Sequence, residues 1–289
     1  MLTKEVRLQI EEIVRNKPCS VQEIAQTIDK NWRTADRYVQ QIQEEHGTIA
    51  TRIFREGSRG ALKIVFWNAL SDKKGTAYQD RLKTLIETGK TKFDFSPMHI
   101  YQFADSQKRQ AQITKEFISS EFRKLVESAQ QQVCFFSGNL SWLKDEKDMI
   151  NLIESLIKRS VKVKFLTRID ITSQTMAANI LKLNLRYGDD MVAIKHCEQP
   201  LRAFIVDDKI ISLKEVYSPS HQKEIKETTF IYYRIKDIVW VSWLQKVFWH
   251  LWEQSIDAQS RIDALLTIEN IDSHITTHIS KQKTPKKIS

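Results

Sequence analysis

The sequence has few of the residues that mark fibrous, disulfide-rich or membrane-spanning proteins. Its 289 residues include only 7 glycines and 5 prolines, too few for a collagen-like or broadly disordered chain. Cys19, Cys134 and Cys197 are odd in number and lack Cys-x-x-Cys spacing, so they indicate neither a disulfide framework nor a zinc site. No apolar run approaches the roughly 20 residues that span a bilayer, and the N-terminus lacks a signal-peptide pattern. We expect a soluble, cytoplasmic protein with reduced thiols and without a metal, a cofactor or a membrane partner.

The charge of the chain is concentrated near its two ends. Lys and Arg number 45 against 36 Asp and Glu, which gives a formal net charge of +9. Residues 1–92 carry a net +5 and residues 281–289 a net +4, whereas residues 93–280 are neutral. A positive excess favours a polyanionic partner. We expect that partner to contact the N-terminal region and the basic tail, residues 269–289, which we interpret as disordered.

The first seventy residues show three helix patterns and then two strand patterns. Apolar residues recur at helical spacing through residues 3–15, again after Pro18, and from residue 32 to about Glu45. Ser20 and Glu23 have the spacing of a capping box, which predicts the start of the second helix. After Gly47 the apolar period changes to two, in a predicted hairpin with a glycine-rich tip. This order of elements resembles a winged helix-turn-helix, and we predict such a domain over residues 1–70.

The third predicted helix has an apolar face and a polar face. Ala35, Val39 and Ile42 gather on one side with Trp32, and Tyr38 lies at the border. The opposite side carries Arg33, Arg37, Gln40 and Glu44, flanked by Thr34 and Gln41. A solvated helix face would show the same pattern, but Arg, Thr and Gln at the start of a recognition helix can meet base edges in the major groove.

The polar residues of the helix and the arginines of the hairpin form the predicted interface with double-stranded DNA. Arg33, Thr34 and Arg37 would contact base edges, and Asn31 would cap the helix or touch the DNA backbone. Arg52, Arg55 and Arg59 would contact phosphates, which supplies salt-sensitive affinity. The predicted DNA-binding set is Asn31, Arg33, Thr34, Arg37, Gln40, Gln41, Arg52, Arg55 and Arg59.

Residues 71–131 are interpreted as a helical connector. The pattern predicts a basic helix over residues 76–88, an aromatic stretch over residues 93–98, and a long polar helical stretch to about Gln131. Such a segment can separate two domains or pair with its copy in a dimer, and the sequence does not decide between the two.

Residues 132–268 alternate strand and helix patterns, which predicts an α/β domain. Apolar strands are expected at 133–136, 161–166, 192–196, 203–206, 210–213 and 229–234, with helices at 145–159, 175–187 and 237–266. Asp207 and Asp208 predict a tight turn between two strands, so the sheet should be mixed. The whole chain is thus expected to be a two-domain α/β protein with a long C-terminal helix.

The segment from Leu201 to Ile211 resembles the strand-turn-strand of the phospholipase D superfamily, in which His-x-Lys precedes an apolar strand that ends in Asp. If Asp207 occupies the family's Asp position, Pro200 falls on the His position and Arg202 on the Lys position. The resemblance implies that the family's nucleophile is missing, so we expect no catalytic residue and no enzyme activity. His196 lies near the lost position but is expected to be structural, and Asp207 with Asp208 is expected to serve the turn.

A winged helix-turn-helix followed by such a catalytically empty domain resembles archaeal TrmB-type transcriptional regulators. The resemblance implies a sequence-specific DNA-binding regulator whose second domain senses a small-molecule effector or mediates homodimer contacts. We expect a homodimer with its two third helices about one DNA turn apart. Two alternatives stay open at this stage: a dimeric nuclease or phosphodiesterase with a rearranged site, and an adaptor whose winged helix binds another protein.

The last predicted helix carries one further candidate residue. Trp240, Leu244, Val247 and Leu251 form a broad apolar face, and Trp249 points nearly opposite to it. Trp249 is a candidate interface residue because large exposed aromatic side chains are enriched at interfaces. A segment from elsewhere in the chain would be an equally good explanation.

Overall fold

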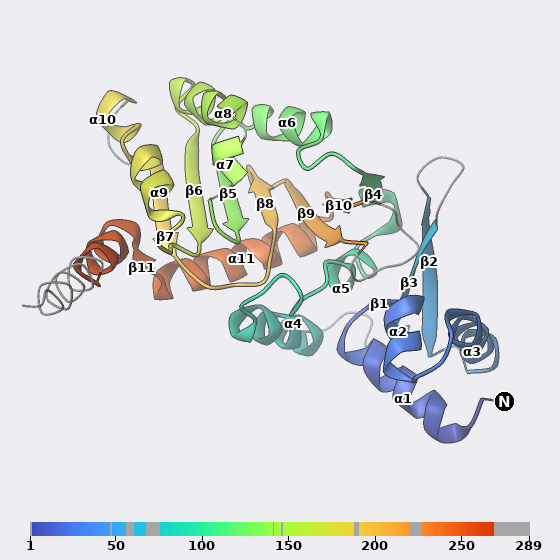
Figure 1. Cartoon of the computed structure of the whole chain (residues 1–289). Coiled ribbons are helices and arrows are strands. Elements are labelled where there is room, and N and C mark those ends of the chain that lie inside the picture. The colour runs from blue at the N-terminus through green and yellow to red at the C-terminus, as the bar shows by residue number, and fades with distance from the viewer. Residues whose placement is uncertain are drawn as a thin grey trace, which may run out of the picture.

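The computed structural model describes residues 2–46, 48–55, 61–67, 76–140, 142–145, 147–187, 191–219 and 227–268. Figure 1 shows an N-terminal unit of three helices and a small sheet beside a larger unit, in which helices flank one long sheet. No helix within these ranges is long and apolar enough to cross a membrane. Arg59 and the basic tail, both named above, lie outside the described residues.

The N-terminal unit contains the predicted elements in the predicted order. Its helices are α1 (Lys4–Asn16), α2 (Val21–Thr27) and α3 (Trp32–Glu45), and its strands are β1 (Cys19–Ser20), β2 (Ile49–Arg55) and β3 (Ala61–Trp67). The strands form an antiparallel sheet of order β1-β3-β2. The predicted capping box starts α2: the backbone N–H of Ser20 donates to Glu23 Oε2 at 2.7 Å, and that of Glu23 donates to Ser20 Oγ at 3.1 Å.

The larger unit is a mixed α/β structure built on an eight-stranded sheet of order β11-β7-β6-β5-β8-β9-β10-β4. Strands β5, β6 and β7 are parallel, and the other neighbours are antiparallel, which confirms the predicted mixed sheet. The strands are β4 (Arg109–Thr114), β5 (Gln132–Ser137), β6 (Lys162–Thr167), β7 (Val192–His196), β8 (Ala203–Val206), β9 (Ile210–Tyr217), β10 (Thr229–Ile235) and β11 (Ile256–Asp257). The helices are α4 (Thr76–Thr88), α5 (Met98–Tyr101), α6 (Ser120–Glu127), α7 (Trp142–Asp145), α8 (Lys147–Lys158), α9 (Gln174–Leu181), α10 (Asn184–Tyr187) and α11 (Ile238–Gln254), with a 3₁₀ turn over Ser106–Lys108 and helical residues 258–268.

The two faces of the large sheet carry separate hydrophobic cores. Successive side chains of a strand point to opposite faces. Val133 and Phe135 of β5 therefore pack with α8 and α9, whereas Cys134 and Phe136 pack with α4, α5 and α11. A strand that is buried on both faces reads as a continuous apolar run, as this one does.

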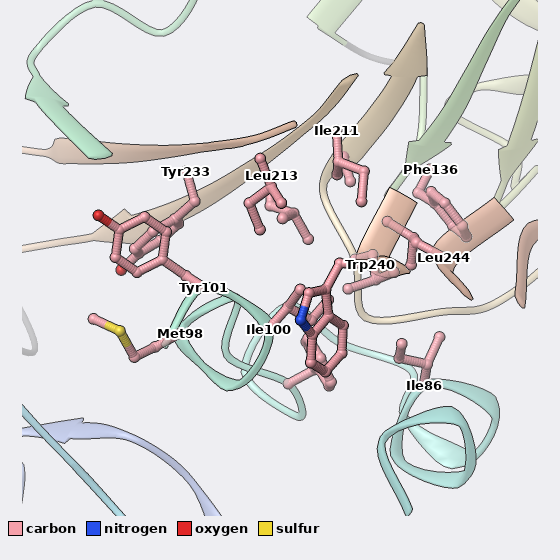
Figure 2. Close-up of a cluster of buried hydrophobic side chains, with 14 of the residues drawn as sticks. Ile86, Met98, Ile100, Tyr101, Phe136, Ile211, Leu213, Tyr233, Trp240 and Leu244 are labelled. Atoms are coloured by element: carbon pink, nitrogen blue, oxygen red, sulfur yellow. The ribbon is translucent and has the colours of Figure 1, made fainter. Parts of the chain in front are cut away.

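Trp240 of α11 lies in the core that contains Cys134 and Phe136. Figure 2 shows its indole among Ile86 of α4, Ile100 of α5 and Leu244 of α11. The ring of Trp240 also meets that of Tyr78 edge to face at a centroid distance of 6.5 Å. The broad apolar face predicted for the last helix is therefore a core face.

The β2–β3 hairpin belongs to two cores at once. Ile49 and Val65 pack against the three N-terminal helices. Phe54 and Leu62 belong instead to the core of the larger unit that contains Cys134 and Phe136. In that core the Phe54 ring meets the Tyr233 ring edge to face, at a centroid distance of 6.2 Å. The hairpin thus fixes the N-terminal unit against the larger unit through continuous apolar packing.

The prediction of a long polar helix that runs to about Gln131 is wrong. The segment instead forms α5, a 3₁₀ turn, the edge strand β4 and α6. Strand β4 alternates, with Gln110 and Gln112 exposed while Ala111 and Ile113 pack against the core. Its six residues pair with β10, which is far away in the sequence, and that pairing outweighs the weak strand propensity of its glutamines.

The prediction of a single C-terminal helix over residues 237–266 is also wrong, because the observed helix ends before Ser255. Ser255 is extended, with φ −87° and ψ 148°. Ile256 and Asp257 then pair with His196 and Lys195 of β7. An otherwise unpaired strand edge gains hydrogen bonds in this way. Helical residues 258–268 follow, and Ala258 and Ile262 join the core on the α8 side.

Asp207 and Asp208 form the tight turn that the sequence predicts between β8 and β9. Their φ angles of 46° and 57° are both left-handed, as the central residues of a type I′ turn require. The carboxylate of Asp207 accepts hydrogen bonds from the backbone N–H groups of Gln130, Gln131 and Gln132 at 2.7, 2.8 and 2.9 Å. Asp207 therefore secures the start of β5.

We predict that Asp207→Asn lowers the free energy of unfolding by about 1–2 kcal/mol, because one of its two accepting oxygens becomes an amide group that cannot accept. Asn tolerates left-handed backbone, so the turn itself is kept. Asp208→Asn is the matched control. Asp208 accepts through Oδ1 from the side-chain amides of Gln132 and Gln245, and Asn retains one such oxygen. Urea denaturation of both variants checks the prediction, and equal losses would contradict it.

Candidate nucleic-acid interface

Helix α3 presents the polar face that the sequence predicts. Ala35, Val39 and Ile42 are fully buried, whereas Arg33 and Arg37 are exposed. Gln40 is also exposed, and Thr34 and Gln41 are half-buried at the flanks. The guanidinium of Arg37 lies 5.6 Å from the centroid of the Tyr38 ring. The two arginines stand one helical turn apart on the same side, as groups that follow one DNA groove would.

The acidic residue in the N-terminal half of α3 is neutralised within the fold. Asp36 forms an ion pair with Lys63 of β3, with Oδ1 and Nζ 2.7 Å apart. The pair joins the helix to the hairpin. Because Asp36 is paired with Lys63, its carboxylate does not neutralise the charges of Arg33 and Arg37. The exposed part of this half-helix is therefore cationic.

Asn31 caps α3, which is one of the two roles predicted for it. Its Oδ1 accepts a hydrogen bond from the backbone N–H of Thr34 at 2.9 Å, and its own backbone is extended. A side-chain oxygen in this position satisfies one of the unpaired N–H groups of a helix start. Asn31 is itself exposed, so it lies at the edge of the polar face.

Trp32 does not lie in the core, contrary to the expectation from its helical phase. Its side chain is 49% exposed. The buried stripe of α3 begins at Ala35, one turn further along, and Trp32 is the first residue of the helix. Its place directly after the N-cap was the signal that it stands at a helix end. An exposed indole next to Arg33 adds an aromatic surface to the candidate interface.

The two described hairpin arginines, Arg52 and Arg55, lie in different environments. Arg55, at the end of β2, is exposed. Arg52 is half-buried, and its guanidinium lies 4.8 Å from the Tyr101 ring centroid, on the side of the larger unit. Arg109 lies over the same ring at 4.9 Å. Arg52 therefore contributes to the contact between the two units, and Arg55 is the hairpin arginine that the structure places next to open surface.

Helix α3 lies on the outer side of the molecule. Figure 1 shows it at the edge of the N-terminal unit that is remote from the large sheet, with α2 and the hairpin between them. The polar face of α3 is consequently presented away from the body of the protein.

The positions that correspond to the phospholipase D motif are buried or largely buried. Pro200 is buried, and its Cγ lies so close to Gly89 that a Cβ at residue 89 would approach it to 2.9 Å. The neighbouring Gln199 is buried too, where its Nε2 donates to the carbonyl of Ser137 at 2.9 Å. Arg202 is largely buried, and burial lowers the pKa of its guanidinium to about 10.

His196 is held in place by a backbone hydrogen bond. Its Nδ1 accepts from the backbone N–H of Ile169 at 2.9 Å, so this nitrogen carries no proton. Burial lowers the pKa of the imidazole, and the nearby positive charge of Arg261 lowers it further. His196 is therefore a neutral side chain that orients a loop. Among the described residues, no three His, Cys, Asp or Glu side chains are grouped so that they could hold a metal ion.

Trp249, the candidate interface residue, is half-buried beside other aromatic rings. Its ring meets that of Phe248 at a centroid distance of 5.5 Å and that of Trp252 at 6.2 Å. The ammonium of Lys164 lies 5.5 Å from its centroid. The structure thus covers part of the indole with residues of the same chain, and an interface role stays a prediction.

Comparisons with known proteins give matches among solved structures alone. No protein-family model matches the chain, and no curated protein matches it. The chain is similar to TrmBL2, an archaeal chromatin protein, with a TM-score of 0.39 and 14% identity over 88% of this chain and 94% of that one. It is also similar to Nuc, a phospholipase D family member from Salmonella typhimurium, with a TM-score of 0.37 and 14% identity over 52% of this chain and 98% of Nuc. NucT from Helicobacter pylori gives a TM-score of 0.37 and 14% identity over 52% and 99%. Both kinds of protein that the sequence resembles are thus among its structural matches.

We predict that Asn31→Ala lowers the free energy of unfolding by about 1 kcal/mol, because α3 loses its N-cap. Asn31→Asp keeps an accepting oxygen and should leave stability within a few tenths of a kcal/mol of the wild type. Chemical denaturation of the two variants measures both values. A destabilisation by Asp as large as that by Ala would show that the hydrogen bond to Thr34 is not what Asn31 contributes.

Proposed function

We propose that this chain is a sequence-specific, DNA-binding transcriptional regulator of the cytoplasm, in which α1, α2, α3 and the β2–β3 hairpin act as a winged helix-turn-helix. The observation that carries the proposal is the outward face of α3. Arg33 and Arg37 are exposed there, the carboxylate of Asp36 is neutralised by Lys63, and the helix lies on the outer side of the molecule. Arginine at such positions can bind guanine through two hydrogen bonds in the major groove.

The hairpin supplies the second part of the proposed interface. Arg55 would contact phosphates beside the groove that α3 enters, and such contacts fix the register of a protein on the duplex without selecting sequence. Trp32 adds an apolar surface at the start of the helix that can contact sugars or thymine methyl groups. Residues 1–92 carry a net charge of +5, which favours approach to the duplex.

The regulator is proposed to act as a homodimer. One helix reads a single half-site of a few base pairs, and two copies about 34 Å apart read two half-sites on the same side of the duplex. The contact between the N-terminal unit and the larger unit supports this arrangement. It would hold both helices in a fixed orientation if the larger units pair.

We also propose that the chain does not cleave phosphodiester bonds. Pro200 offers no nucleophile at the position that corresponds to the family's histidine. His196 is half-buried and uses Nδ1 to hold the backbone of Ile169. The carboxylate of Asp207 accepts three backbone hydrogen bonds, which explains that residue without catalysis.

Loss of Arg37 should weaken specific binding. We predict that Arg37→Ala reduces affinity for a duplex selected by the wild-type protein by on the order of 1–3 kcal/mol, with much less effect on a scrambled duplex. Arg186→Ala is the control, because Arg186 is an exposed arginine on α10 at the far end of the molecule. Fluorescence anisotropy at constant salt measures both. Equal affinity of the wild type and Arg37→Ala for the selected duplex would remove α3 from the interface.

Loss of Arg55 should act on all sequences alike. A phosphate contact releases counterions, so Arg55→Ala should weaken selected and scrambled duplexes equally and reduce the slope of log K against log salt by about 1. Titrations at several salt concentrations give the slope. An unchanged slope would show that Arg55 contacts no phosphate.

The absence of cleavage can be tested directly. We expect plasmid and single-stranded DNA to stay intact after incubation with the protein, with or without divalent metal. If cleavage occurs and is lost in His196→Ala, the nuclease alternative replaces the proposal. Electrophoresis of the products decides between the two outcomes.

A further inference from the structure

A cavity of about 530 Å³ opens in the larger unit. Its walls come from the ends of β5 and β6, from β8, β9 and β10, and from the loop that carries Phe117 and Ile118. This volume lies in the range of small-molecule sites in proteins. The DNA-binding proposal makes no use of it.

Four cationic side chains line this cavity: Lys92, Arg168, Arg202 and Lys214. No Asp or Glu is among the described residues that line it. Arg168 pairs with Asp170 at 3.1 Å, but none of the other three forms an ion pair with a described carboxylate. Buried charges are ordinarily paired. Lys92 is exposed, whereas Arg202 and Lys214 are largely buried, so the interior of the cavity holds two cationic groups without a described carboxylate partner.

Arg202 is positioned by a residue without a side chain. A Cβ at Gly138 would lie 2.1 Å from the Nη2 atom of Arg202, so the guanidinium occupies the space that glycine leaves free. Arg202 Nη1 also donates to the carbonyl of Leu201 at 2.8 Å. The guanidinium is thus held beside the end of β5, at the wall of the cavity.

Lys214 is the most confined of the four. Its ammonium lies 3.4 Å from the centroid of the Phe117 ring and 5.5 Å from that of Phe230. Burial lowers the pKa of Lys214 to about 7, and the positive charges of Arg202 and Lys92 contribute to the decrease. Arg168 and Tyr232 are the other titratable side chains of the cavity wall, and the Tyr232 hydroxyl donates to the carbonyl of Phe117. An anion close to Lys214 would relieve the repulsion among these cations.

Most of the other lining residues are aromatic or aliphatic, and Ser137, Asn139, Ser212 and Thr228 also line the cavity. Rings make up much of the wall, and Phe122 meets Phe204 edge to face at 4.8 Å while Phe135 stacks on Phe165 at 4.8 Å. Aromatic faces of this kind stack on flat ligands. The aromatic residues that line the cavity are Phe117, Phe122, Phe135, Phe136, Trp142, Phe204, Phe230 and Tyr232.

We propose that this cavity binds an aromatic phosphate monoester, with the phosphate between Arg202, Lys214 and Lys92 and the ring against the phenylalanine walls. A phosphate dianion offsets most of the unpaired charge, and Arg binds phosphate through two parallel hydrogen bonds. The ring accounts for the apolar wall, which inorganic phosphate alone would leave uncovered. No residue of the candidate nucleic-acid interface lines the cavity.

The binding test uses the full chain and four probes without DNA: adenosine 5′-monophosphate, phenyl phosphate, inorganic phosphate and adenosine. Isothermal titration calorimetry should give a Kd for at least one aromatic monoester at least tenfold below that for phosphate and for adenosine. Failure of both aromatic monoesters to bind at millimolar concentration would overturn the proposal. Phosphate bound as tightly as the monoesters would also overturn it.

Two classes of variant test separately whether binding needs the cationic groups of the cavity and whether it needs the observed position of the Arg202 guanidinium. Lys214→Met and Arg202→Met each remove one cavity charge, and Gly138→Ala removes none but displaces the Arg202 guanidinium. We expect all three to raise the Kd of the monoester tenfold or more while circular dichroism and thermal unfolding show a folded protein. Lys195→Met is the matched control, because Lys195 is a half-buried lysine that donates to the Trp252 carbonyl and does not line the cavity. An equal loss in the control, or no loss in the three variants, would contradict the assignment.

Proton uptake provides a readout that a merely structural lysine would not give. At pH 8 Lys214 is mostly neutral, and a bound dianion should raise its pKa so that it takes up close to one proton. Titrations in buffers of different ionisation enthalpy measure this number. The uptake should disappear in Lys214→Met, and its persistence there would place the phosphate elsewhere.

Discussion

The arrangement of the whole molecule depends on one hairpin that is shared by two cores. Ile49 and Val65 bury one side of β2 and β3 against the N-terminal helices, while Phe54 and Leu62 bury the other side with Tyr233. Apolar burial is the main favourable term in folding, so such a shared element costs much to separate. The position of α3 relative to the large sheet is therefore a property of the fold and not of a flexible linker.

Local signals in the sequence predicted the N-terminal unit well. The capping box of Ser20 and Glu23 and the N-cap of Asn31 define helix starts within a few residues, and a period of two defines the hairpin. The structure departs from the predictions where a partner is far away in the sequence. Strand β4 pairs with β10, and Ile256 pairs with β7, so neither could be recognised from its own few residues.

The candidate sites differ in the same way. Arg33 and Arg37 are four residues apart on one helix, so their common face follows from helical geometry. The cavity cations come from four separate segments, and the sequence pattern singled out only Arg202, at the Lys position of the phospholipase D motif, so it did not reveal the group. Trp32 was assigned to the wrong side, because helical phase alone does not show where the packed part of a helix begins.

Three of the cavity cations lie close to the junction of the two units. Lys92, Arg202 and Lys214 also line a second, smaller cavity, whose wall includes Lys17 and Glu23 of the N-terminal unit. These three side chains therefore line both the proposed ligand site and a cavity that the N-terminal unit helps to form.

Selection of bound duplexes from a random pool tests the central claim most directly, because it examines DNA reading and the fixed placement of α3 together. We expect enriched sequences with two related half-sites whose centres are about 10–10.5 base pairs, or a multiple of one turn, apart. A pool that shows no enrichment over its input at low salt would contradict it.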